Sequence, residues 1–117
     1  MSLQHVALEV RAADADAEVA FWALLGFAEV EPPGSLRKRS RWVQRGVTQV
    51  HLLFAEAPVI PPEGHVAVLA PAFAEVGARL AAVGRIPELR EAHWGAPRAF
   101  VTSPAGHRVE LMEAPPP

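Results

Sequence analysis

The sequence contains no cysteine and carries little excess charge of either sign. Without thiols the chain cannot form disulfides, use a thiolate nucleophile or bind a metal through sulfur. The net charge is −2 at pH 7, so the sequence lacks the basic surface that binding to nucleic-acid phosphates requires, and we expect no nucleic-acid partner. Any metal site in this chain must be built from nitrogen and oxygen ligands.

The sequence also lacks a long apolar run and a basic N-terminal region followed by a cleavage signal. We therefore expect no membrane partner and a cytoplasmic protein. At 117 residues, with 50% hydrophobic and 21% charged residues, the chain fits one folded domain over 1–117 and is too short for two independent ones.

Four residues of the types that bind metals stand at matching places in the two halves of the chain. His5 and His65 each open an apolar run and are 60 positions apart, while His51 and Glu110 lie inside later apolar runs and are 59 positions apart. This spacing predicts an internal repeat, with one unit over 1–57 and a second over 64–114.

Each repeat reads as the order βαβββ. The expected strands of the first repeat are 4–10, 27–31, 41–45 and 48–54, with a helix over 15–25 that Asp14 or Asp16 caps and Gly26 ends. The second repeat has expected strands at 65–69, 86–90, 98–102 and 108–113, with a helix from near Pro71 to Gly84. His93 and His107 fall in loop-like segments, and we expect both to be exposed to solvent.

The four repeated residues predict a metal-centred site. Side chains on a strand alternate between its two faces, so each of the four shares a face with the residues two positions away. If these faces line one cavity, three imidazoles and one carboxylate converge, a set that suits Fe(II), Mn(II), Ni(II), Co(II) or Zn(II). Four protein ligands on an octahedral metal leave two open positions, which a small substrate can occupy through neighbouring oxygens. The ligand hypothesis names His5, His51, His65 and Glu110.

Other residues are candidates for catalysis or substrate binding, and some of them have a second interpretation. Glu110 and Glu9 are the candidate catalytic carboxylates, and Glu9 is either a general base or part of a salt bridge at the cavity rim. Arg45 either binds an anionic substrate tail or belongs to a solvated hairpin face. Trp42 and Phe54 are candidates for an aromatic pocket wall, whereas Trp22 is expected in the core or a dimer interface.

Several motifs resemble the vicinal oxygen chelate family, which includes glyoxalase I, fosfomycin-resistance transferases, extradiol dioxygenases and bleomycin-resistance proteins. The motifs are Asp14, Phe21-Trp22, Leu25-Gly26-Phe27 and the segment Ser103-Pro104-Ala105-Gly106-His107-Arg108-Val109-Glu110-Leu111, and the resemblance covers nearly the whole chain. It implies an α+β fold in which two βαβββ modules form curved mixed sheets around a cavity. It also implies a homodimer, a small-molecule substrate and a divalent metal ion held by the four repeated residues, either within one chain or across the dimer.

The resemblance implies several activities. A glyoxalase-type lyase or isomerase is the first expectation, although glyoxalase I carries a glutamate where His51 stands, which argues against isomerisation of methylglyoxal. An extradiol-type dioxygenase or a fosfomycin-type thiol transferase needs two histidines and one carboxylate, which His5, His65 and Glu110 supply. A metal-free dimer that sequesters a drug, like the bleomycin-resistance proteins, is the alternative from another class, and it does not require metal ligands.

Overall fold

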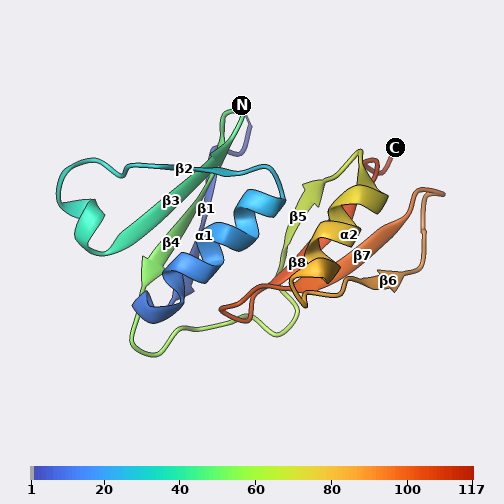
Figure 1. Cartoon of the computed structure of the whole chain (residues 1–117). Helices are drawn as coiled ribbons and strands as arrows, with labels where there is room; N and C mark the ends of the chain where they lie inside the picture. The colour runs from blue at the N-terminus through green and yellow to red at the C-terminus, as the bar shows by residue number, and fades with distance from the viewer. Residues whose placement is uncertain (1) are drawn as a thin grey trace. The chain divides into compact units, whose positions relative to one another are not determined.

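The computed structural model describes residues 2–117, and Met1, with which the predicted first repeat begins, lies outside the described residues. The chain divides into two compact units, one ending at Ile60 and the other beginning at Pro61. Each unit contains a four-stranded mixed sheet and one α-helix, so the predicted α+β fold and βαβββ order are confirmed (Figure 1).

The first unit consists of β1 (His5–Val10), α1 (Ala15–Leu24), β2 (Ala28–Val30), β3 (Ser40–Arg45) and β4 (Thr48–Phe54), with short 3-10 helices at Ala12–Asp14 and Gly34–Lys38. The second consists of β5 (Val66–Leu69), α2 (Phe73–Ala82), β6 (Glu88–Arg90), β7 (Arg98–Thr102) and β8 (Arg108–Met112). The strand orders are β1-β4-β3-β2 and β5-β8-β7-β6. In both sheets the first strand pairs with the last in parallel, because the intervening helix and strands return the chain to the same end, and the other pairs are antiparallel.

The two sheets have the same register around the predicted ligands. Ala7 on β1 pairs with His51 on β4, and Ala67 on β5 pairs with Glu110 on β8. We call His5 and His65 the outer ligand candidates, and His51 and Glu110 the inner ones. Each outer histidine stands two positions before the alanine of its unit, so it lies on the same sheet face as the inner candidate. Register thus gives each unit one outer and one inner ligand candidate on a common face.

The opposite faces of the sheets form the cores. In the first unit Val43, Val50 and Leu52 are almost completely buried, and Trp22 from α1 is buried with them. Trp22 donates a hydrogen bond from Nε1 to Oε2 of the buried Glu18, at 3.1 Å, which provides a partner for both polar groups inside the core. The core alternative for Trp22 is therefore the one observed.

The second unit is built in the same way. Val109 and Leu111 on β8 are buried on the face opposite Glu110's side chain, and Leu80 and Val76 of α2 are buried as well. Figure 1 shows α2 lying along the sheet of its own unit.

Several element boundaries differ from the predicted ones by one or two residues. Helix α2 begins at Phe73, because Pro71 and Ala72 form a turn before it. Strand β6 begins at Glu88 and not at residue 86, because Pro87 has no N–H to donate to a ladder. Asp14 occupies the N-cap position of α1, but its side chain makes no capping hydrogen bond.

The expectation that His107 is exposed is wrong, whereas His93 is exposed as predicted. His107 is only 4% exposed, because the turn after β7 folds back on itself. The N–H of His107 donates to Oγ of Ser103 at 3.1 Å, and the N–H of Ser103 donates to the carbonyl of His107 at 2.8 Å. The turn thus draws His107 into the second unit.

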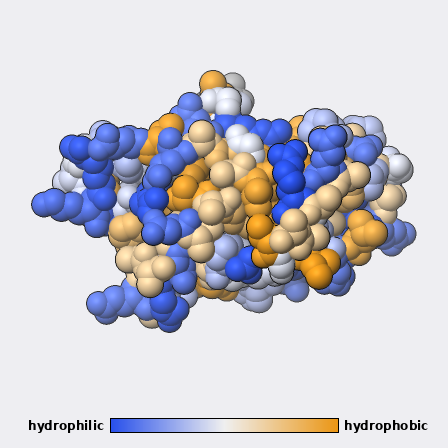
Figure 2. All heavy atoms as spheres, viewed as in Figure 1, coloured by the Kyte–Doolittle hydropathy of each residue, from blue (hydrophilic) through white to orange (hydrophobic). Residues whose placement is uncertain are grey.

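Hydrophilic residues cover much of the surface viewed in Figure 2, and hydrophobic atoms show between them. Large exposed apolar side chains include Val47 and Ile86, which lie in different loops. Exposed apolar side chains of this kind are common in folded proteins. Over residues 2–117, neither helix has the length and apolar character needed to cross a bilayer.

Candidate functional site

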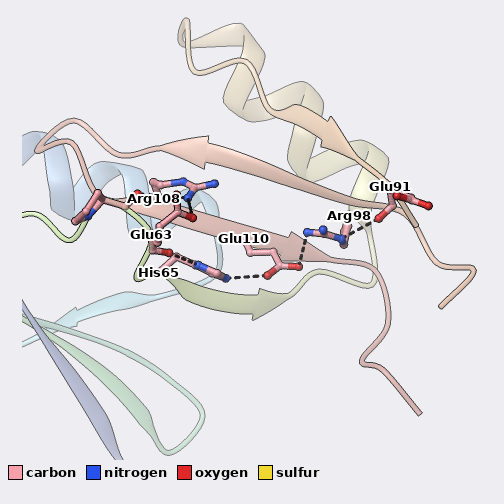
Figure 3. A network of polar contacts seen from close by, with 7 residues as sticks. Glu63, His65, Glu91, Arg98, Arg108 and Glu110 are labelled. Atoms are coloured by element: carbon pink, nitrogen blue, oxygen red, sulfur yellow. Dashed lines mark hydrogen bonds and ion pairs between the residues drawn. The ribbon is translucent and has the colours of Figure 1, made fainter. Parts of the chain in front are cut away.

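In the second unit, the outer and inner ligand candidates are in direct contact. His65 directly precedes β5 and Glu110 lies on β8, and His65 Nε2 is 3.1 Å from Glu110 Oε1 (Figure 3). The other ring nitrogen, Nδ1, lies 2.9 Å from the carbonyl oxygen of Glu63. Because a carbonyl only accepts, Nδ1 is the donor in this contact, and Nε2 is the ring nitrogen that faces Glu110.

Arg98 on β7 holds the second oxygen of the same carboxylate. Its Nη1 lies 3.1 Å from Glu110 Oε2, and its Nε donates to the carbonyl of Glu91 at 2.9 Å (Figure 3). The side chains of Arg98 and Glu110 are only 13% and 9% exposed. The carboxylate is therefore fixed from both ends, with Oε1 directed to His65 and Oε2 to Arg98.

In the first unit, the two histidines are stacked. The ring centroids of His5 and His51 are 4.1 Å apart with an interplanar angle of 15°, and Trp42 on β3 stacks on His51 at 3.7 Å and 4°. Since β4 lies between β1 and β3, His51 is enclosed between the other two rings. The sequence prediction of an aromatic wall at Trp42 coincides with a ring directly against a predicted ligand.

Glutamine side chains orient the stacked imidazoles. Gln4 Oε1 lies 2.6 Å from His5 Nδ1, and Gln49 Oε1 lies 2.8 Å from His51 Nε2. Gln49 is itself oriented by donating to Gln44 Oε1 at 2.7 Å. With the amide oxygens accepting, His5 Nε2 and His51 Nδ1 carry the lone pairs that are suited to a metal.

Burial lowers the pKa of His51 below its ordinary value, and the positive charge that His5 can carry lowers that pKa further. Both effects favour the neutral imidazole, which is the form that binds metal.

The two ligand candidates of the second unit are spaced as two ligands of one metal ion would be, whereas those of the first unit are not. Two ligands at right angles on a metal with bonds of about 2.1 Å are separated by about 3 Å, which the His65–Glu110 pair matches. In the first unit the lone pairs of His5 and His51 lie in nearly parallel planes, so one ring must rotate before both bind the same ion. Among residues 2–117, no group of three or more potential ligand side chains is gathered. Each unit by itself offers two.

The remaining predicted site residues, Glu9, Arg45 and Phe54, lie on three different strands of the first unit. Glu9 shares a face with His5, and its Oε1 accepts the N–H of Val59 at 2.8 Å. Arg45 points to the side of the sheet that carries α1 and donates to the carbonyl of Leu25 at 3.3 Å. Phe54 stands three positions after His51, on the opposite face of β4. The structure therefore does not bring Arg45 or Phe54 to the histidines.

The sequence prediction missed Arg98 and Phe100, although both stand within the predicted strand 98–102. Phe100 pairs with Glu110, and its ring contacts His65 edge-on with a centroid distance of 4.9 Å. It occupies the place in the second sheet that Trp42 occupies in the first, where Trp42 pairs with His51. The repeat of an aromatic residue 58 positions after Trp42 was the available signal.

No protein-family model matches this sequence, and no curated protein matches it either. Solved structures with similar folds include a glyoxalase family protein from Bacillus anthracis, at 23% identity and a TM-score of 0.86, covering 96% of this chain and 93% of that one. A lactoylglutathione lyase from Agrobacterium tumefaciens has 22% identity, a TM-score of 0.72 and coverages of 95% and 92%. The oxidase ChaP-H2 has 21% identity, a TM-score of 0.78 and coverages of 99% and 95%. The chain has the glyoxalase-type, vicinal oxygen chelate fold.

Proposed function

We propose that this protein is a divalent-metal-dependent lyase or isomerase of the glyoxalase type, which acts on a small substrate chelated through neighbouring oxygens. The observation that carries the proposal is the His65–Glu110 contact of 3.1 Å, made at sheet positions equivalent to those of His5 and His51. A sheet face with an imidazole and a carboxylate at ligand separation suits an ion of the Fe, Mn, Ni, Co or Zn type.

The proposed ligands are His5, His51, His65 and Glu110, two from each unit. They meet either within one chain or between the chains of a homodimer, and the protein acts in the cytoplasm. A bound metal would act as a Lewis acid that stabilises negative charge on the substrate oxygens.

The chain's own residues would orient the ligands and move the proton. Glu63 fixes the tautomer of His65 through its carbonyl, and Arg98 holds Glu110 Oε2 so that Oε1 faces His65. We assign proton transfer to a carboxylate, either Glu110 or Glu9. Glu9 stands on the His5 face of β1, and the Val59 N–H orients one of its oxygens.

Oxygen-dependent chemistry is the second candidate. Two histidines and one carboxylate with open positions are the ligands that Fe(II) oxygenases use, and ChaP-H2, one of the proteins with a similar fold, is an oxidase. Fe(II) as the native metal, together with oxygen consumption on addition of a catechol, would favour this candidate over the isomerase.

The experiment is elemental analysis of the protein purified without a histidine tag, followed by titration of Ni(II), Zn(II), Mn(II) and Fe(II) into the stripped form. We expect tight rebinding of at least one of these metals, strongly weakened in His5→Ala and in Glu110→Ala. His93→Ala, which removes an exposed histidine outside the repeat, is the matched control and should bind like the unaltered protein.

Failure of all four metals to bind would overturn the proposal and favour a metal-free drug-binding protein. Full metal occupancy in Glu110→Ala would refute the ligand assignment even if the metal requirement held.

A further inference from the structure

Three guanidinium groups surround the ring of Phe100 in the second unit. The Cζ atoms of Arg108, Arg90 and Arg98 lie 4.3, 5.6 and 5.7 Å from the ring centroid. All three arginines share the sheet face of Phe100, because Arg90 pairs with Arg98 and Thr102 pairs with Arg108. Contacts with an aromatic face partly replace water around these cations and hold them in place.

The three arginines differ in how firmly their carboxylate partners hold them. Arg98 is paired with Glu110, and both side chains are nearly buried. Arg108 lies 3.5 Å from a carboxylate oxygen of Glu63, whose side chain is 94% exposed, and Arg90 lies 3.2 Å from one of Glu88, which is 69% exposed. Exposed ion pairs contribute little and exchange readily with water, so Arg108 and Arg90 can transfer to another anion at small cost, while Arg98 cannot.

A cavity of about 370 Å³ opens beside these two arginines. Its lining includes Arg85, Arg90, Arg108, Phe100, Thr102 and Glu88. Phe100 lines the cavity and also contacts His65, so this one ring connects the cavity to the His65–Glu110 pair, which lies outside the lining. Three arginines against one exposed glutamate give this lining an excess of positive charge.

We propose that this cavity binds the anionic group of the substrate, a carboxylate or phosphate, through Arg90 and Arg108. This inference rests on the proposed function, since it assigns a charged group to the substrate of the proposed metal site. The planar fork of an arginine matches both anions by paired hydrogen bonds, and Thr102 adds a hydroxyl to the same lining. On binding, Arg108 leaves Glu63 and Arg90 leaves Glu88, and both released carboxylates turn to water.

The test uses the full chain in the presence of a chelator, so that no metal contributes to binding. The probes are benzoate and phenyl phosphate, with benzamide as the uncharged probe of the same ring, and binding is followed by calorimetry and by NMR shifts of the Phe100 ring. We expect binding of at least one anion but not of benzamide, weakened about tenfold or more in Arg108→Met and in Arg90→Met. The preferred anion identifies the group as carboxylate or phosphate.

Two further variants sharpen the result. Arg79→Met removes an exposed arginine from α2, whose guanidinium lies 3.9 Å from Glu75, and should leave anion binding unchanged. Glu63→Gln removes the competing carboxylate and should strengthen anion binding, a gain that a loss of folding cannot imitate. Equal binding of benzamide, or unchanged anion binding in both Arg108→Met and Arg90→Met, would overturn the inference.

Metal titration separates this inference from the function on which it rests. Anion binding without any metal binding would retain the cavity assignment and remove the metalloenzyme proposal. Metal binding with no anion binding would retain the metalloenzyme proposal and remove the cavity assignment.

Discussion

The ion pair between Arg98 and Glu110 gives a stability prediction that needs no metal. Replacing Arg98 by Met keeps the apolar stem and removes the guanidinium, which leaves a carboxylate that is 9% exposed without its cation. Breaking a fully buried pair costs about 3–5 kcal/mol. Because His65 still contacts Glu110 and some solvent reaches the site, we expect the free energy of unfolding to fall by about 2 kcal/mol.

The assay is urea unfolding at pH 7 in the presence of a chelator, with Arg79→Met as the matched control. The same substitution in that exposed pair on α2 should cost about 0.5 kcal/mol or less. In the double variant Arg98→Met with Glu110→Gln, no buried charge is left without a counterion. We therefore expect its loss of unfolding free energy to be about 1 kcal/mol smaller than the sum of the two single losses. A cost for Arg98→Met no larger than that for Arg79→Met would refute the reasoning.

Two further predictions concern the stacked imidazole of the first unit. Because Trp42 lies 3.7 Å from His51, metal binding at His51 should change the tryptophan emission; Trp42→Phe should abolish this change and leave only the signals of Trp22 and Trp94. Burial lowers the pKa of His51, so the unfolded chain binds its proton more readily than the folded chain does. Acidifying the metal-free protein from about pH 7 to pH 5 should therefore lower its stability, and the loss should be smaller in His51→Gln but unchanged in His93→Gln.

The sequence was sufficient to predict the elements and the faces of the four repeated residues, because strand alternation and a repeat near sixty residues are local properties. The ligand pairs could be related by their spacing alone, and the observed registers of Ala7 with His51 and Ala67 with Glu110 agree with that repeat. Arg98 could not be assigned to Glu110 in the same way. Their contact depends on the register of β7 against β8 and on the rotamers of two long side chains, neither of which a single sequence determines.

The wrong prediction that His107 is exposed has a different cause. A histidine after Ser103-Pro104-Ala105-Gly106 has the composition of an exposed turn, and composition was the only guide. The hydrogen bonds between Ser103 and His107 close that turn onto the sheet, so its last residue is drawn inward. Which side of a turn is buried depends on the surface beneath it, and that surface is formed by residues distant in sequence.

The two units share a backbone pattern, but the surroundings of their inner ligand candidates, His51 and Glu110, differ in charge. Ser40 and Arg98 occupy equivalent places, since Ser40 pairs with Leu53, two positions after His51, and Arg98 pairs with Met112, two positions after Glu110. Arg98 neutralises the carboxylate of Glu110, whereas Ser40 donates its hydroxyl to the carbonyl of Leu36 at 2.7 Å and leaves His51 between aromatic rings. A neutral imidazole tolerates that uncharged environment, and a carboxylate would be stranded in it. The inner ligand candidates, His51 and Glu110, are therefore not interchangeable, because moving the glutamate to the first unit also requires a cation at the position of Ser40.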